Sequence, residues 1–116
     1  MATTPEGCVK SRIDILLKAQ GAKCWYAKPV QNGMGTPMLD YHGAHAGFAF
    51  AIEAKKPGGE PTERQKATAR ALIQAGAAVF LIDGDLSELY AWLNAPCADP
   101  YTRWRKMLDL HRRIYD

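Results

Sequence analysis

The sequence predicts an α/β domain in which helices flank a mixed β-sheet. Two apolar runs, 48–54 and 78–83, have the length of buried strands. Between them lies 62–76, where apolar residues recur at helical spacing, and a strand–helix–strand order is typical of parallel strands joined by a right-handed crossover. With 116 residues, 47% of them hydrophobic and 23% charged, the chain has the size and composition of one globular domain.

The first predicted element is a helix over residues 4–21. Thr4 is a suitable N-cap, Pro5 fits the first turn and Gly21 fits the end of the helix. An apolar stripe follows the helical period and consists of Val9, Ile13, Leu16 and Leu17. Glu6 falls on the same face. We expect it either to be favoured there by the helix dipole or to reach a site on the sheet.

Three strands are expected after this helix, over residues 23–28, 37–41 and 48–54. Residues 41–47 contain two glycines, so they are predicted to reverse the chain and to pair the second strand with the third. His42 and His45 lie in this reversal, and we interpret them as solvated turn residues.

Charged residues end the third strand. Positions two apart on a strand share a face, so Glu53 and Lys55 are predicted to point the same way. A hairpin would place Asp40 on the strand beside Glu53. Two carboxylates about 4 Å apart repel by roughly 4 kcal/mol at an effective dielectric near 20, and a divalent cation between them would turn repulsion into binding. Oxygen ligands suit Mg²⁺ or Mn²⁺. The alternative is a surface ion pair.

The second helix begins with a capping box. Thr62 and Gln65 have the spacing at which each side chain accepts the other residue's backbone N–H. Gln65 also shares the inward face of the helix, so it is expected to point toward the strand that contains Glu53. The remaining predicted elements are a strand at 78–83 and a short helix at 86–94, which completes an αβββαβ order with an added helix.

Taken together, these segments resemble the VRR-NUC domain, a branch of the PD-(D/E)xK nuclease superfamily. The resemblance depends on the order and spacing of Pro5-Glu-Gly-x-Val-Lys10, Gly33-Met-Gly35, Asp40, Ile52-Glu-Ala-Lys55, Pro57-Gly-Gly-x-Pro-Thr62 and Gln65. It implies a restriction-endonuclease-like core over residues 1–95 and a metal-dependent nuclease activity.

The resemblance also implies a role for each site residue. The implied ligands of Mg²⁺ or Mn²⁺ are Asp40, Glu53 and the carbonyl of Ala54. The other implied catalytic residues are Lys55 as the catalytic lysine, with Glu6 and Gln65 as the helix-borne carboxylate and glutamine. Lys55 would orient a water or stabilise the negative charge that builds on phosphorus.

Stand-alone members of this family, often virus-encoded, are similar to junction-resolving enzymes. We therefore expect a homodimeric endonuclease that cuts branched DNA such as four-way junctions, encoded by a phage or prophage and acting in the host cytoplasm. A two-fold dimer would place two active sites for paired nicks. Two alternatives remain: a nuclease for flaps, single strands or RNA, and a non-catalytic nucleic-acid-binding module.

The C-terminal segment, 96–116, is predicted to be a basic amphipathic helix. Residues 101–116 contain five Lys or Arg and two Asp or Glu, whereas the rest of the chain has ten of each, so this segment supplies the whole net charge of +3. It could pack on its own core, form a dimer or contact DNA. The candidate phosphate contacts are Lys10, Lys28, Lys56, Lys66, Arg103, Arg105, Arg112 and Arg113.

The three cysteines are Cys8, Cys24 and Cys97. They lack zinc-ligand spacing and cannot all pair, which favours free thiols in a reducing cytosol. No apolar run is long enough to span a membrane, and the N-terminus has no signal-peptide pattern, so we expect no membrane partner.

Overall fold

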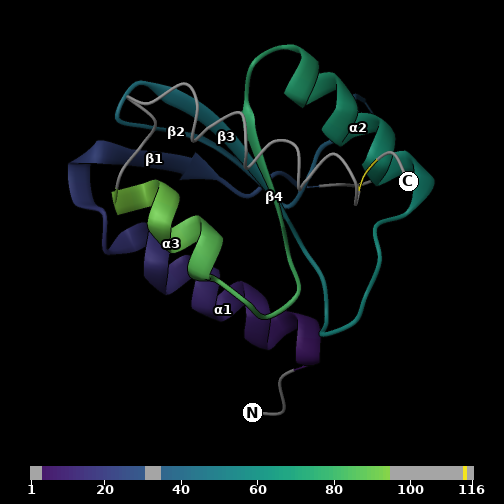
Figure 1. Cartoon of the computed structure of the whole chain (residues 1–116), viewed down its shortest axis with the longest axis horizontal. Helices are drawn as coiled ribbons and strands as arrows, with labels where there is room; N and C mark the ends of the chain where they lie inside the picture. The colour runs from purple at the N-terminus through teal and green to yellow at the C-terminus, as the bar shows by residue number, and fades with distance from the viewer. Residues whose placement is uncertain (1–3, 31–34, 95–113, 115–116) are drawn as a thin grey trace.

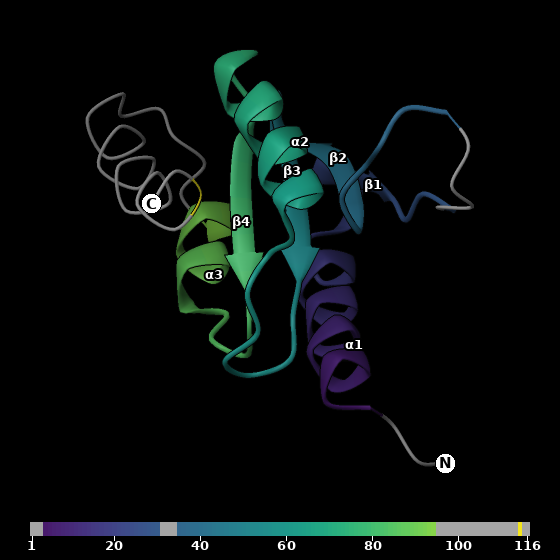
Figure 2. The same ribbon diagram turned by 90° about the vertical axis from the view of Figure 1, so that its right-hand side faces the viewer.

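The chain forms a four-stranded sheet with helices on both faces. The structure, a computed structural model, describes residues 4–30, 35–94 and 114. Its elements are α1 (Pro5–Lys18), the 3-10 turn η1 (Gly21–Lys23), β1 (Cys24–Ala27), β2 (Tyr41–His45), β3 (Phe48–Ala54), α2 (Glu63–Gln74), β4 (Ala78–Ile82) and α3 (Ser87–Asn94). Helices α1 and α3 cover one face and α2 covers the other (Figures 1 and 2). The predicted α/β class is therefore confirmed.

The sheet is mixed and its strands follow sequence order, β1-β2-β3-β4. The first two pairings are antiparallel and β3 runs parallel to β4. A parallel pair needs a long crossover connection, and α2 provides it (Figure 2). As a result the carboxyl ends of β3 and β4 lie at one edge of the molecule, next to the start of α2.

The second strand differs from its prediction. It covers Tyr41–His45, not 37–41, and the chain reversal is confined to Ala46 and Gly47. Both of these residues have positive φ, 49° and 89°, as the type I′ turn of a two-residue hairpin requires. Alanine seldom adopts this conformation, so a turn this tight could not be predicted from the residues at these positions.

The two histidines in this region are strand residues, and their interpretation as solvated was wrong. His45 is only 1% exposed and its ring lies 5.7 Å from that of Trp92. His42 accepts a hydrogen bond from the Leu39 backbone N–H at Nε2, at 2.9 Å. Burial lowers the pKa of both rings, which favours the neutral form that can accept this bond.

Each face of the sheet has its own apolar core. On the α1 and α3 side, the Trp92 ring lies between the rings of Phe50 and Phe80, at 5.8 and 5.5 Å. On the α2 side, the core is smaller and contains Ala51, Ala69 and the fully buried Ile114. Residues 96–113 and 115–116 of the predicted C-terminal helix lie outside the described residues.

No helix in the described ranges combines the length and the apolar character needed to cross a bilayer. Cys8 and Cys24, which fall within those ranges, are free thiols.

Gly43 lets β1 approach β2 closely. A Cβ atom at this position would lie 2.2 Å from the Trp25 carbonyl oxygen and 2.9 Å from the Tyr26 Cα. Both contacts are with backbone, which cannot rotate away as a side chain could.

Replacement of Gly43 by alanine should therefore destabilise the sheet. We expect Gly43→Ala to lower the free energy of unfolding by about 1–3 kcal/mol, the usual cost of overpacking. Chemical denaturation monitored by circular dichroism measures this change. Ala44→Ser, at the exposed neighbouring position, is the matched control and should stay within about 0.5 kcal/mol of the wild type.

Candidate active site at the carboxyl end of β3

Glu53 is a carboxylate buried at the end of an apolar strand. Its side chain is only 3% exposed, and Lys55, two residues later on the same side, places Nζ 3.7 Å from Glu53 Oε2. The same oxygen accepts a hydrogen bond of 3.0 Å from Gln65 Nε2. The other oxygen, Oε1, is buried and has no hydrogen-bond partner.

Gln65 links the start of α2 to this carboxylate. Its Oε1 accepts from the Thr62 N–H at 2.9 Å, and its own N–H donates to Thr62 Oγ1 at 3.2 Å, which completes the predicted capping box. Its Nε2 remains free for Glu53. The two bonds together define which end of the amide is oxygen and which is nitrogen.

Asp40 lies immediately before β2 and faces the last residues of β3. Its Oδ2 accepts a hydrogen bond of 2.9 Å from the Ala54 N–H. The N–H and C=O of one strand residue point to the same side of the strand, so we expect the Ala54 carbonyl to lie on the Asp40 side as well. Asp40 was expected to end a strand, but here it caps the part of β3 that extends beyond β2.

Helix α1 adds Glu6 and Lys10 to the cluster. Lys10 Nζ lies 3.6 Å from Glu6 Oε2 and 3.6 Å from Asp40 Oδ1. Tyr41 Oη donates to the Lys10 carbonyl at 3.1 Å, which fixes this turn of the helix against β2. The structure thus brings all five predicted catalytic residues to one end of the sheet. Glu6 is connected to Asp40 by the Lys10 ammonium, which lies 3.6 Å from both carboxylates.

Two contributors to the site were missed in the sequence. Lys10 was considered only as a DNA contact, although its position four residues after Glu6 predicts an ion pair on one helix face. His42 supports the backbone just before Asp40 through its bond to Leu39. No sequence pattern indicated that role.

Glu53 is held in an environment that opposes its ionisation. Burial raises the pKa of Glu53 most, and repulsion by Asp40 adds to this, so that the pKa reaches about 8. A protonated Glu53 can donate a hydrogen bond to the Asp40 carboxylate, and this bond also raises the pKa of Glu53. The Lys55 ammonium lowers the pKa, but by less.

The residues at this site suit a divalent cation of the magnesium type. When Glu53 is ionised, its Oε1 has no hydrogen-bond donor, and the Lys10 ammonium lies 3.6 Å from Asp40 Oδ1. Carboxylate and carbonyl oxygens are the ligands that Mg²⁺ and Mn²⁺ prefer. Within the described ranges no three His, Cys, Asp or Glu side chains converge on one point. A cation here would therefore depend on Asp40, Glu53, the Ala54 carbonyl and water.

The predicted phosphate contacts differ in their surroundings. Lys28 pairs with Asp14 at 3.0 Å, and Lys66 lies 3.5 Å from Glu63. Lys56 lies with Lys55 and Glu6 at a hollow of about 440 Å³ beside the carboxylates. The four arginines of the tail, Arg103, Arg105, Arg112 and Arg113, lie outside the described residues.

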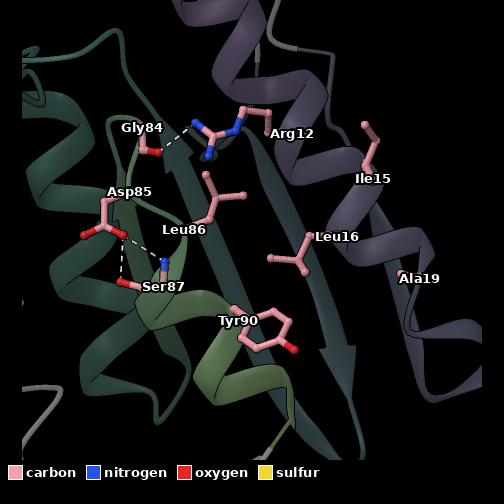
Figure 3. A pocket seen from close by; sticks show the side chains of 9 residues that line it. All are labelled: Arg12, Ile15, Leu16, Ala19, Gly84, Asp85, Leu86, Ser87 and Tyr90. Atoms are coloured by element: carbon pink, nitrogen blue, oxygen red, sulfur yellow. Dashed lines mark hydrogen bonds between the residues drawn. The ribbon is translucent and has the colours of Figure 1, made fainter.

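A larger groove, of about 580 Å³, lies elsewhere, between α1 and α3 (Figure 3). Leu16, Leu86 and Tyr90 line it, and Arg12 closes one end by donating to the Gly84 carbonyl at 2.9 Å. Its lining includes none of the clustered carboxylates, and its chemistry is that of an apolar surface.

No protein-family model, curated protein or solved structure matches the chain. Membership of the nuclease family therefore stays a prediction from the sequence motifs.

The raised pKa of Glu53 makes the metal-free protein sensitive to pH. The folded state keeps a proton on Glu53 that the unfolded chain releases near pH 4.5, so this contribution to stability is complete below that pH. It is lost as the pH rises toward 8. We expect the free energy of unfolding in EDTA to fall over this range, by about 1.4 kcal/mol for each unit of pKa difference at most.

Glu53→Gln is the matched control for this effect. Glutamine has the shape of glutamate but cannot ionise. Subtracting the variant's stability profile from that of the wild type therefore removes the contributions of His42 and His45, which both proteins share. Denaturation curves between about pH 5 and pH 9 supply both profiles. Parallel profiles for wild type and variant would contradict a raised pKa at Glu53.

Proposed function

We propose that this protein is a Mg²⁺- or Mn²⁺-dependent nuclease that hydrolyses phosphodiester bonds in DNA. The observation that supports this most strongly is the state of Glu53, a buried carboxylate with one oxygen held by Gln65 and Lys55 and the other without a partner. Asp40 lies close enough to raise the pKa of Glu53, and two neighbouring carboxyl groups are costly unless they share a proton or a cation, so the pair suits a divalent cation.

Each side chain has a distinct task in this proposal. Asp40, Glu53 and the Ala54 carbonyl would hold the cation, which when bound supplies Lewis-acid polarisation of the phosphodiester and an acidified water. Lys55 directs its ammonium at the attacking water or at the negative charge that develops on phosphorus. Gln65 keeps the Glu53 carboxylate in one orientation, as outer partners of ligands commonly do.

The hollow beside the carboxylates gives a phosphodiester room to approach. It opens between the start of α1 and the segment after β3, where Lys55, Lys56 and Gly59 line it. Glu6 and Glu60 also line the hollow, so a phosphate would be attracted to the part of it that Lys55 and Lys56 line. We take DNA as the substrate, branched DNA as the preferred form and the homodimer as the active species, which are the properties implied by the sequence resemblance.

Cleavage of a panel of labelled substrates tests this function. The panel consists of a four-way junction, fork, flap, single strand and duplex, each incubated with Mg²⁺, Mn²⁺ or EDTA. We expect cutting only with metal and fastest on the junction, and light scattering should give the mass of a dimer. Faster cutting of the flap or the single strand would support metal-dependent hydrolysis but contradict branched DNA as the preferred substrate. Binding without any cutting would favour the non-catalytic module.

Removal of the lysine tests the assignment of the site. Lys55→Met retains the aliphatic stem, so the fold and Mn²⁺ binding should persist while the cleavage rate falls by about 10²–10³-fold, the usual cost of losing one such charge. Lys23→Met, at an exposed position on η1, is the matched control and should cleave at the wild-type rate. Equal rates for both variants, or cutting by the wild type in EDTA, would contradict this active site.

A further inference from the structure

The position of Lys10 suggests a second task for this residue. Its ammonium is shared between two carboxylates on different elements, 3.6 Å from Glu6 on α1 and 3.6 Å from Asp40 before β2. The Asp40 oxygen that it faces is Oδ1, since Oδ2 is already engaged by the Ala54 N–H. Lys10 thus lies against the carboxylate oxygen that a cation would need.

A bound cation and Lys10 would compete for this oxygen. A Mg²⁺ or Mn²⁺ ion lies about 2 Å from a carboxylate oxygen. With its present 3.6 Å contact to the same oxygen, the Lys10 ammonium could be no more than about 6 Å from the ion. Two positive charges at that separation, in a site where Glu53 is almost fully buried, repel each other strongly.

The balance of charge at the site also predicts that a bound cation displaces Lys10. Three carboxylates, Glu6, Asp40 and Glu53, surround the site, and Lys55 and Lys10 oppose them. A divalent cation and Lys55 alone would balance the three carboxylates. Lys10 is then in excess.

We propose that Lys10 is an exchangeable cation: it holds Asp40 and Glu6 in the metal-free protein, and metal binding releases it to a backbone phosphate of the substrate. This inference rests on the proposed function. Lys10 is 39% exposed, so its side chain can leave the cluster without disturbing the core. Glu6, one turn earlier on the same helix, already lines the hollow where a phosphodiester would approach.

Metal binding without DNA tests the first half of the proposal. Electron paramagnetic resonance of free Mn²⁺ gives its dissociation constant for the wild type, Lys10→Met and Lys18→Met. Loss of the competing ammonium should make Lys10→Met bind Mn²⁺ about three- to tenfold more tightly. Lys18→Met, on the exposed end of the same helix, should match the wild type. Unchanged or weaker Mn²⁺ binding by Lys10→Met would overturn the exchange.

DNA binding tests the second half. With Ca²⁺ in place of Mg²⁺, Lys10→Met should bind a labelled DNA junction more weakly, and the slope of log affinity against log salt should decrease by about 1. Lys18→Met should retain the wild-type slope. A wild-type slope in Lys10→Met would overturn the phosphate contact.

Failure of the inference can be separated from failure of the proposed function. If the wild type binds Mn²⁺ and cuts DNA while Lys10→Met behaves identically, only the role of Lys10 is wrong. If the wild type neither binds Mn²⁺ nor cuts, both proposals fall. Lys10→Gln, which retains a polar end, provides a second variant should the methionine disturb folding, and thermal melting checks each protein before use.

Discussion

The burial of Glu53 is the constraint on which the rest of the site depends. A carboxylate taken out of water must be neutralised or given partners, since an isolated buried charge is very costly. Here one oxygen receives an amide and an ammonium, and a raised pKa lets the carboxyl retain its proton. The other oxygen, Oε1, is buried and has no hydrogen-bond donor when the carboxyl is ionised.

The fold meets this constraint by joining segments that are far apart in the sequence. The strand β3 ends one residue after Glu53, and the crossover to the parallel strand β4 places the first turn of α2 above that end. The hairpin of β2 and β3 brings Asp40 back to the same edge. Helix α1 packs against the opposite face and lets Glu6 and Lys10 reach it. The apolar cores on the two faces thus position a polar cluster that belongs to neither.

Local periodicity predicted the parts of the site that follow a regular element. The period of two placed Lys55, just after β3, on the same side of the chain as Glu53. The capping box and the helical period together placed Gln65 toward them. The start of β2 was missed because it depends on Ala46 adopting a positive φ, which tertiary pairing imposes against local preference. The bridging position of Lys10 was missed for another reason. A flexible side chain goes to whichever charges the folded chain presents, and Asp40 is 30 residues away.

Gln65 limits how this site can vary. Its oxygen must accept from Thr62 while its nitrogen donates to Glu53. Glutamate would still complete the capping box, but it would place another carboxylate within about 3 Å of a buried one, where the two would repel. Asparagine is one methylene shorter and would lose one of the two contacts. Few amino acids can make both hydrogen bonds, so one side chain connects the start of α2 to the buried carboxylate on β3.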